Sequence, residues 1–332
     1  MFCRELRLYG NIVVRLLLYC MRLMSDAINT CVIFNPTSGR GRAQRALEEA
    51  RRFHAADHEF RATCKPGDAE LIAIQAIRDG FGKVVAAGGD GTVHEVANGI
   101  LRAGNPDVLL GVWPFGSAND YACALGITGD PQQPRAVQNV DVGLVEGPPG
   151  RQRFFVNGLG IGFNGAVTVE ARKIGWLRGM PLYGLAILRA MLWHFHKPTM
   201  RLRFDDRECE TPTLGLTLNL GKREGGFPLT PAADLSDGMF DYMHAGPVGR
   251  WELLRHFPNM IRGTLPTDHP RMWQGRCRRL QVNSESPLRI HVDGEFFCHS
   301  EDGIHEIDVT LLPRWLRVEQ AADSSVHSGR PA

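Results

Sequence analysis

The sequence predicts an α/β protein whose first part is built on a parallel sheet and whose second part is rich in β-strand. Between residues 31 and 127, short apolar runs alternate with longer amphipathic stretches. After GDPQQP (129–134) the pattern changes to strand-like runs with one long helical interruption at 165–197. Alternating strands and helices are typical of βαβ units, in which the strands lie parallel. We therefore expect one α/β domain at 28–135 and a β-rich domain at 136–309.

Each expected strand of the first domain is followed by a turn and a helix. The strands are 31–35, 58–64, 83–89 and 108–114, and the helices are 43–53, 68–80, 92–104 and 117–127. The helix at 68–80 has clear boundary signals, with Asp68 near its start and Gly80 at its end. In the second domain, residues 310–320 form a final strand that either closes the second sheet or returns to the first domain. The small, polar residues 321–332 are expected to be a disordered tail.

Residues 1–27 form an extension before the first strand. Residues 11–24 are apolar but shorter than the ~20 residues that a membrane span needs, and Arg15 and Arg22 interrupt them. No A-x-A-like cleavage site follows, which argues against a secretory signal. Two interpretations stay open: an anchor lying in the membrane interface, or a misassigned start with Met24 as the true first residue.

The composition is that of a globular protein. Hydrophobic residues make up 43% and charged residues 22%, which excludes a wholly disordered chain. The net charge of +2 gives no overall field that would attract nucleic acid, so we expect no nucleic-acid partner. The eight Cys include no C-x-x-C pair, which argues against a disulfide or zinc framework and favours the cytoplasm.

The first glycine-rich loop, NPTSGRGRA, begins at Asn35 and follows a strand. Gly39 and Gly41 let backbone amides turn toward an anion, and Arg40 can reach a phosphate. The loop lacks the G-K-[ST] ending of a P-loop, so that mechanism does not apply. Glycine-rich turns without a phosphate are also common.

The second loop, AAGGDGTVHEVANG (86–99), is more specific because three glycines surround one carboxylate, Asp90. Such a loop lets a polyphosphate approach backbone N–H groups closely, and Asp90 is then placed to hold a divalent cation or accept a proton. Thr92 is expected to cap the helix, with Glu95 completing a capping box. A capped loop with an incidental Asp is the alternative.

The third loop, PFGSANDYA (114–122), also joins a strand to a helix. Ser117 is expected to cap the helix, while Asn119 and Asp120 could bind ribose, an adenine edge or metal-held water. Asn-Asp in a first helical turn is also ordinary capping chemistry. Because the carboxyl ends of parallel strands meet at one edge, the three loops should converge on one crevice.

The three loops, in this order, resemble the diacylglycerol kinase catalytic domain family, together with PLTPAADLSDGMFD (228–241) and HVDGEFF (291–297). The resemblance covers about residues 28–320. It implies a Rossmann-like first domain of the type found in NAD kinases and phosphofructokinases, and a C-terminal β-sandwich domain. It also implies ATP-dependent phosphorylation of a hydroxyl of diacylglycerol or a related lipid, with ATP and Mg²⁺ as cofactors.

The family's motifs imply roles for individual residues. Glu295 would be the proton acceptor and Asp90 the second catalytic residue, although Asp293-Gly294 alone is more simply interpreted as a hairpin turn. Mg²⁺ would be held at Asp234, Asp237 and the carbonyl of Met239, a segment that is otherwise a polar turn. The expected nucleotide contacts are Asn35, Ser38, Gly39, Arg40, Thr63, Gly88, Gly89, Asp90, Gly91, Thr92, Val93, His94, Ser117 and Asn119.

A lipid kinase without a membrane span must visit the membrane reversibly. Residues 175–195 and the Arg/Trp segment 271–279 are the candidate surfaces, although a core helix and a solvated strand are the alternatives. We expect a cytoplasmic protein peripherally associated with the membrane, with a homodimer left open. The alternative functions are a catalytically silent lipid-binding or regulatory module, and NAD kinase, which shares GGDGT but follows it with a different segment.

Overall fold

The computed structural model describes residues 29–36, 58–130, 133–174, 177, 179–266 and 268–322. The extension 1–27 and the helix expected at 43–53 lie outside these residues. So do Ser38, Gly39 and Arg40 of the first glycine-rich loop, and the tail from residue 323 onward.

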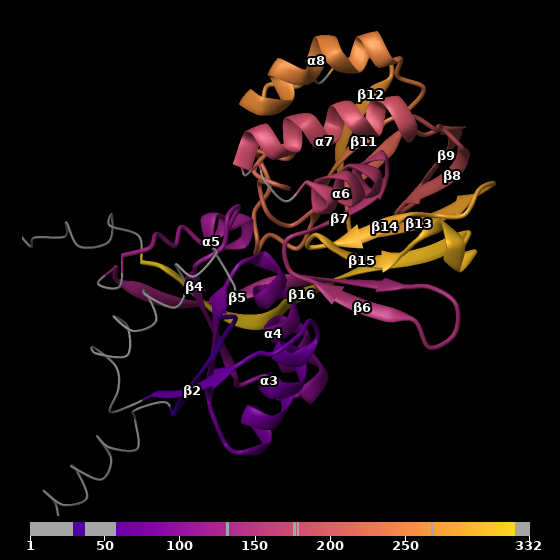
Figure 1. Ribbon diagram of the computed structural model, residues 1–332. Coiled ribbons are helices and arrows are strands. Elements are labelled where there is room, and N and C mark those ends of the chain that lie inside the picture. The colour runs from indigo at the N-terminus through magenta and orange to yellow at the C-terminus, as the bar shows by residue number, and fades with distance from the viewer. Residues whose placement is uncertain are drawn as a thin grey trace, which may run out of the picture.

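Four parallel strands form the sheet of the first domain, as expected from the alternating pattern, in the order β2-β1-β3-β4 (Figure 1). Helices α3 and α4 pack on each other and on this sheet, burying apolar side chains such as Val84 and Val96. The elements are β1 (Thr30–Phe34), β2 (His58–Ala62), α3 (Asp68–Arg78), β3 (Lys83–Gly88), α4 (Asp90–Ala103), β4 (Leu109–Pro114) and α5 (Asp120–Ala124).

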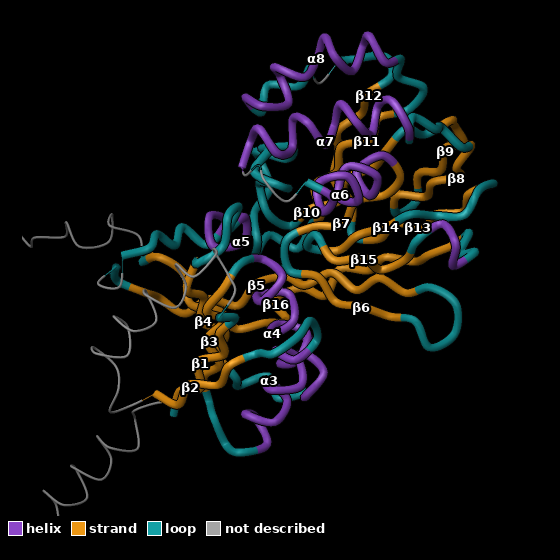
Figure 2. Tube along the Cα trace, viewed as in Figure 1, coloured by secondary structure: helices purple, strands orange, loops and turns teal. Residues whose placement is uncertain are grey.

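The second domain contains a six-stranded antiparallel sheet in the order β12-β11-β10-β7-β14-β15. Three helices, α6, α7 and α8, lie on one side of it (Figures 1 and 2). The sheet strands are β7 (Gly158–Gly162), β10 (Gly215–Asn219), β11 (Phe240–Ala245), β12 (Met272–Cys277), β14 (Ile290–Val292) and β15 (Glu295–Cys298), and the helices are α6 (Phe163–Lys173), α7 (Gly179–Trp193) and α8 (Arg250–Arg262).

The helical part of this domain differs from expectation. The single interruption expected at 165–197 is two helices, α6 and α7, which pack against each other. Helix α8 was not predicted, although Leu253, Phe257 and Met260 recur at helical spacing and pack into the core beneath it. Among the described residues, no helix is both long and apolar enough to cross a membrane.

The parallel sheet of the first domain continues into the second domain through the last strand, which was expected either to close the second sheet or to return to the first domain. Strand β16 (Glu306–Ala321) pairs with β4 in parallel at Arg317–Val318 and with β13 and β5 in antiparallel fashion. The resulting ten-stranded sheet therefore runs from the parallel strands into the second domain. Its remaining strands are β5 (Arg135–Glu146), β6 (Gln152–Phe155), β8 (Thr199–Phe204), β9 (Arg207–Pro212) and β13 (Arg279–Ser284), and a short 3₁₀ turn, η2 (Ser300–Asp302), precedes β16.

Strand β16 connects the two domains along its length. Ala321 pairs with Arg135, so the strand includes the first residue of the expected tail. Because β16 hydrogen-bonds to both domains, it limits how far one domain can rotate against the other. The loops at the carboxyl edge of β3 and β4 therefore face a fixed part of the second domain.

Candidate active site

The loops after β3 and β4 pack directly on each other. A Cβ atom at Gly116 would lie 2.4 Å from the Cα atom of Gly89, and one at Gly88 would lie 2.4 Å from the Thr92 hydroxyl. No side chain fits at Gly88 or Gly116 without displacing these neighbours. The glycines predicted to admit a phosphate thus also let the two loops converge, and Asn35 and Thr63 follow β1 and β2 at the same edge.

The capping predicted for α4 is wrong. Its N-cap residue is Gly89, with no side-chain cap. The Glu95 carboxylate instead accepts hydrogen bonds from the backbone N–H groups of Gly67 (2.8 Å) and Ala69 (3.0 Å). Glu95 therefore satisfies the start of the neighbouring helix α3, where amides lack partners within the helix.

The cap predicted for the third loop is also wrong. Ser117 is exposed, and α5 begins after Asn119, whose φ of 53° lies in the left-handed region. The Asn119 side chain accepts from the Gly116 N–H (2.9 Å) and donates to the Gly116 carbonyl (3.2 Å). Its amide thus holds its own loop.

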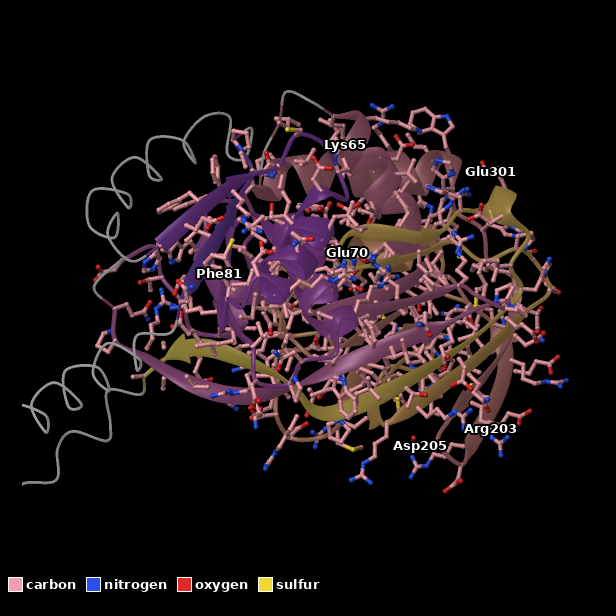
Figure 3. The ribbon with its side chains drawn as sticks, turned by 90° about the horizontal axis from the view of Figure 1, so that it is seen from below. Lys65, Glu70, Phe81, Arg203, Asp205 and Glu301 are labelled. Carbon is pink, nitrogen blue, oxygen red and sulfur yellow. The ribbon has the colours of Figure 1, made fainter. Side chains whose placement is uncertain are left out.

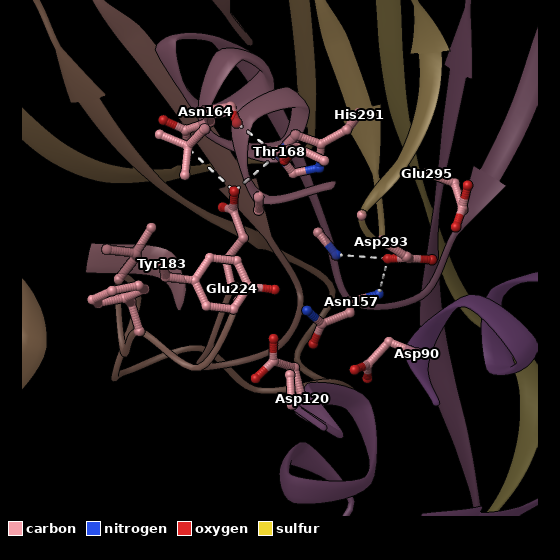
Figure 4. Close-up of a pocket in the computed structure, with 18 of the residues that line it drawn as sticks. Asp90, Asp120, Asn157, Asn164, Thr168, Tyr183, Glu224, His291, Asp293 and Glu295 are labelled. Carbon is pink, nitrogen blue, oxygen red and sulfur yellow. Dashed lines mark hydrogen bonds and ion pairs between the residues drawn. The ribbon is translucent and has the colours of Figure 1, made fainter. Parts of the chain in front are cut away.

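A cavity of about 400 Å³ lies between the domains. Figure 4 shows Asp90 and Asp120 at one side of it and Glu224 and Tyr183 at the other, with Asp293 and Glu295 alongside. An apolar part of the lining comes from the three helices of the second domain: Val167 and Ala171 of α6, Leu182 and Ile187 of α7, and Leu253 and Met260 of α8. The cavity lining thus has an acidic part and an apolar part.

Two carboxylates of the first domain belong to the acidic part. Burial raises the pKa of Asp90, against the hydrogen bond that Asp90 accepts from the Tyr121 N–H (3.3 Å). Burial and the nearby Asp90 raise the pKa of Asp120 to about 7. Asp120 accepts from the Gly226 N–H (3.0 Å), a contact between the domains. The sequence named both Asn119 and Asp120 as able to bind, and only Asn119 was among the expected nucleotide contacts, but Asp120 is the one that lines the cavity.

The Asp-Gly-Glu segment forms the tight hairpin turn that the residues alone predicted. Asp293 and Gly294 have φ values of 51° and 84°, and Val292 pairs with Glu295 across the turn. A Cβ atom at Gly91 would lie 3.2 Å from Glu295 Oε1. The fold therefore brings the Glu295 carboxylate of the second domain against the first turn of α4, beside Asp90.

His94 lies beneath this turn. Its side chain is 1% exposed, and its Nδ1 atom is 2.8 Å from Asp293 Oδ2. It is not among the residues that line the cavity, in contrast to Asp90, Gly91, Val93 and Ser117.

A second polar group lines the cavity around Glu224, a residue that no sequence motif pointed to. Glu224 accepts from the Thr217 hydroxyl (2.9 Å) and from Asn164 Nδ2 (3.3 Å), and lies 3.0 Å from His291 Nε2. These residues come from α6, β10, β14 and one loop, so only the fold brings them together (Figure 4).

The segment predicted to hold Mg²⁺ is an outer turn of the second domain. Asp234 accepts from the backbone N–H and hydroxyl of Ser236 (both 2.9 Å), and Asp237 accepts from the Met239 N–H (3.1 Å) and pairs with Arg276. No cluster of three acidic, His or Cys side chains suited to a metal occurs within the described ranges.

Two buried carboxylates that the sequence did not single out lie behind this turn. Asp141 accepts from the N–H groups of Gly238 (2.7 Å) and Arg314 (2.8 Å), which ties the turn to β16. Asp241 Oδ2 is buried without a hydrogen-bond donor among the described residues, although Arg276 Nε lies 3.5 Å away. An all-oxygen donor set with one unsatisfied carboxylate oxygen suits a hard cation, provided that Arg276 releases Asp237.

Comparison with known proteins agrees with this architecture. Residues 29–145 match the diacylglycerol kinase catalytic domain, and residues 158–319 match the YegS C-terminal NAD kinase beta sandwich-like domain. A crystal structure of a diacylglycerol kinase from Bacillus anthracis superposes with a TM-score of 0.66 at 19% identity, covering 90% of this chain and 98% of that one.

Sequence relatives extend over most of the chain. A diacylglycerol kinase of Bacillus subtilis is 30% identical over 80% of this chain and 89% of its own length. One from Staphylococcus aureus is 31% identical over 80% of this chain and 85% of its own length. The chain therefore belongs to the diacylglycerol kinase family and is a lipid kinase.

Proposed function

We propose that the protein transfers the γ-phosphate of ATP to a hydroxyl of diacylglycerol or a related lipid. One observation carries the proposal: a single cavity is lined both by Asp90 and Glu295 and by apolar side chains of three helices. A lipid with its hydroxyl beside Glu295 would lay its acyl chains along α6, α7 and α8. The acceptor and its proton-accepting group would then meet at the edge of the parallel sheet.

Glu295 is the proposed proton acceptor. It takes the proton of the lipid hydroxyl as the oxygen bonds to the γ-phosphorus and the bond to ADP breaks. Mg²⁺ bound to the phosphates would supply charge neutralisation, and Asp90 and Asp120, which line the cavity on the side of the first domain, are the carboxylates proposed to hold it. Burial raises the pKa of both acids, and Asp90 adds to the rise at Asp120, so a bound cation would favour the ionised form of each.

The nucleotide is proposed to lie along the carboxyl edge of β1 to β4. The first turn of α4 offers N–H groups that lack partners within the helix, and such amides favour phosphate. Residues Gly88–Val93, with Asn35, Thr63 and Ser117, flank this edge. Asn119 would support the nucleotide through its loop. Ser38, Gly39 and Arg40 stay predictions of the sequence.

A second Mg²⁺ is proposed at the outer turn, with Asp234, Asp237 and the Met239 carbonyl as ligands. The buried Asp241 oxygen without a donor supports a cation there. This ion would hold the turn against Asp141 and β16.

Labelled ATP and a panel of lipids test the activity. The panel contains diacylglycerol, monoacylglycerol, ceramide, a sphingoid base and phosphatidylglycerol, with NAD as a separate acceptor. We expect label in one of the lipids, and at least about 100-fold slower labelling with Glu295→Gln. Lipid binding without label would favour a silent lipid-binding module, and labelled NADP would favour NAD kinase. A homodimer stays a prediction that sedimentation of the same preparation can test.

The protein is also proposed to be cytoplasmic and to dock reversibly on membranes through α7 and α8. Six of the ten exposed large hydrophobic side chains among the described residues lie on these two helices, including Trp193 (65% exposed) and Trp251 (85%). Arg255 and Arg262 are exposed on α8, next to Leu254 and Ile261. An apolar and basic outer face is typical of helices that lie in an anionic membrane interface.

The segment 271–279 is less suited to this docking than the sequence suggested. Arg276 pairs with Asp237 and Arg279 pairs with Asp308, so acidic partners already neutralise two of its cations. In contrast, α7 and α8 both line the cavity. They are also connected, because Arg250 Nε donates to the Met191 carbonyl (3.0 Å).

Vesicle sedimentation separates the two surfaces. Trp251→Ala should lower the fraction bound to anionic vesicles about tenfold or more, since burying a large apolar side chain contributes ~1.5–3 kcal/mol. Trp315→Ala, at a tryptophan that is 58% exposed on β16, is the matched control and should change binding little. If Arg276, Arg278 and Arg279 changed together to Ser lowered binding more than Trp251→Ala did, the docking surface would be β12 and β13.

A further inference from the structure

A chain of buried and half-buried polar side chains links the helices of the first domain to the turn that carries Glu295. Arg153 of β6 pairs with Glu70 of α3 through Nη1, and its Nε atom donates to His94 Nε2 of α4 (3.0 Å). His94 Nδ1 lies 2.8 Å from Asp293 Oδ2. Figure 3 shows Glu70 where the two domains meet, far from Arg203 and Asp205 at the outer end of the second domain.

The partners of His94 determine its tautomer. Arginine has no acceptor, so the hydrogen bond from Arg153 requires His94 Nε2 to be the unprotonated nitrogen. The proton therefore sits on Nδ1 and is donated to Asp293. Asn98 Nδ2, a second donor, lies 3.5 Å from the same Nε2 atom, which agrees with an unprotonated Nε2. Both ring nitrogens are then occupied, and the side chain is 1% exposed.

Both carboxylate oxygens of Asp293 accept two hydrogen bonds each, which fix the turn in place. Its Oδ2 accepts from His94 and from the Val156 N–H (3.0 Å), and its Oδ1 accepts from the N–H groups of Asn157 (2.8 Å) and Gly158 (2.9 Å). Burial alone would raise the pKa of Asp293, but the hydrogen bonds from His94 and these amides hold it below its usual value. Asp293 is thus an ionised anchor, and Glu295 follows two residues later.

Helix α4 carries both Asp90, at the cavity, and His94, which contacts Asp293. Asp90 begins the helix, and His94 follows one turn later on the same face. Gly91, between them, packs against the Glu295 carboxylate. A contact from His94 to Asp293 therefore sets the position of Glu295 relative to Asp90.

We propose that His94 is a positioning residue for Glu295, acting through Asp293, rather than a nucleotide contact as the family resemblance implied. The proposal rests on the proposed function, in which Glu295 accepts the proton of the lipid hydroxyl. In this proposal the hydrogen bond from His94 Nδ1 to Asp293 is the contact that affects turnover. The bond from Arg153 orients the ring.

Two substitutions separate the two halves of the ring. In His94→Asn, an amide nitrogen lies one bond beyond Cγ, as Nδ1 does, so it can donate to Asp293 but cannot reach Arg153. In His94→Gln, the amide lies two bonds beyond Cγ, as Nε2 does, so it can accept from Arg153 but loses Asp293. Each variant loses one buried hydrogen bond, so similar losses of stability are expected.

We expect His94→Asn to keep kcat within about threefold and His94→Gln to lower it by about 10- to 100-fold, because a misplaced proton acceptor costs turnover of this order. The KM for ATP should change less than twofold in both. His244→Gln, at a buried histidine on β11 outside the cavity, is the control for replacing a buried ring and should leave kcat unchanged.

Amide hydrogen exchange gives a readout that does not depend on activity. In His94→Gln the amides of Val156, Asn157 and Gly158 should exchange faster, and in His94→Asn they should stay protected. Equal exchange and equal kcat losses in the two variants would mean a merely structural role. A raised KM for ATP with kcat preserved would contradict the proposal and support a nucleotide contact for His94. If the wild-type protein labels no lipid, the proposed function fails, while the exchange data still decide what His94 holds.

Discussion

Two turns of the second domain carry acidic motifs of similar appearance, Asp293-Gly294-Glu295 and Asp237-Gly238, but they are built differently. In the inner turn, four donors saturate the buried Asp293, which leaves the neighbouring Glu295 at the cavity. In the outer turn, Asp237 is exposed and pairs with Arg276. We therefore expect catalysis at the turn in which a buried, hydrogen-bonded Asp293 fixes the backbone that carries Glu295, and only structural support at the turn whose carboxylate faces solvent.

The largest effect is expected at Asp90, which faces the inner turn. Asp90→Asn should abolish lipid phosphorylation, because it removes a charge beside the expected triphosphate that matters most in the transition state. Turnover with saturating Mg²⁺ and ATP is the measurement, and circular dichroism checks the fold. Near-normal turnover would mean that Asp90 is not a catalytic residue.

The next effect is expected at the inner turn itself. Glu295→Gln should lower kcat by about 10²–10⁴-fold, the usual range for loss of a general base, with little change in ATP affinity. Steady-state kinetics and ATP titration measure the two quantities. Parallel losses of both would indicate a nucleotide or folding role for this residue.

His244 on β11, the strand that follows the outer turn, should lower the free energy of unfolding in acid. Burial lowers the pKa of His244 from 6.5 to about 4. The unfolded state therefore binds more protons in this range, so stability is complete above pH 6.5 and falls as the pH drops toward 4. The loss should reach about 3 kcal/mol at most. Thermal melts at pH 7 and pH 4.5 should show a smaller acid loss in His244→Gln than in the wild type.

The smallest effect is expected at the outer turn. Asp237→Asn should keep kcat within about tenfold, since the residue is outside the cavity, but it should remove any rise in melting temperature on adding Mg²⁺. Melting curves with and without Mg²⁺ test this, with Asp206→Asn, at an exposed residue of the β8–β9 hairpin, as the control. An unchanged Mg²⁺ response would contradict the proposed ligand set.

Much of the first domain could be predicted from the sequence. Apolar runs followed by amphipathic stretches indicated four parallel strands, and the loops that follow β3 and β4 do converge. The Asp-Gly turn was also readable, because positive φ angles favour these residue types. Such features depend on neighbours within a few residues. Helix α8 was readable in the same way and was missed.

What only the tertiary structure decided concerns partners far apart in the chain. The sequence by itself determined the parallel domain, the glycine-rich loops, the acidic motifs and the family resemblance. It did not place Glu95 at the start of α3, decide between the two courses left open for the last strand, or enclose His94 between Arg153 and Asp293. A side chain's hydrogen-bond partner depends on which distant segment packs beside it. Local periodicity reports only on neighbours within a few residues, so it does not predict that segment.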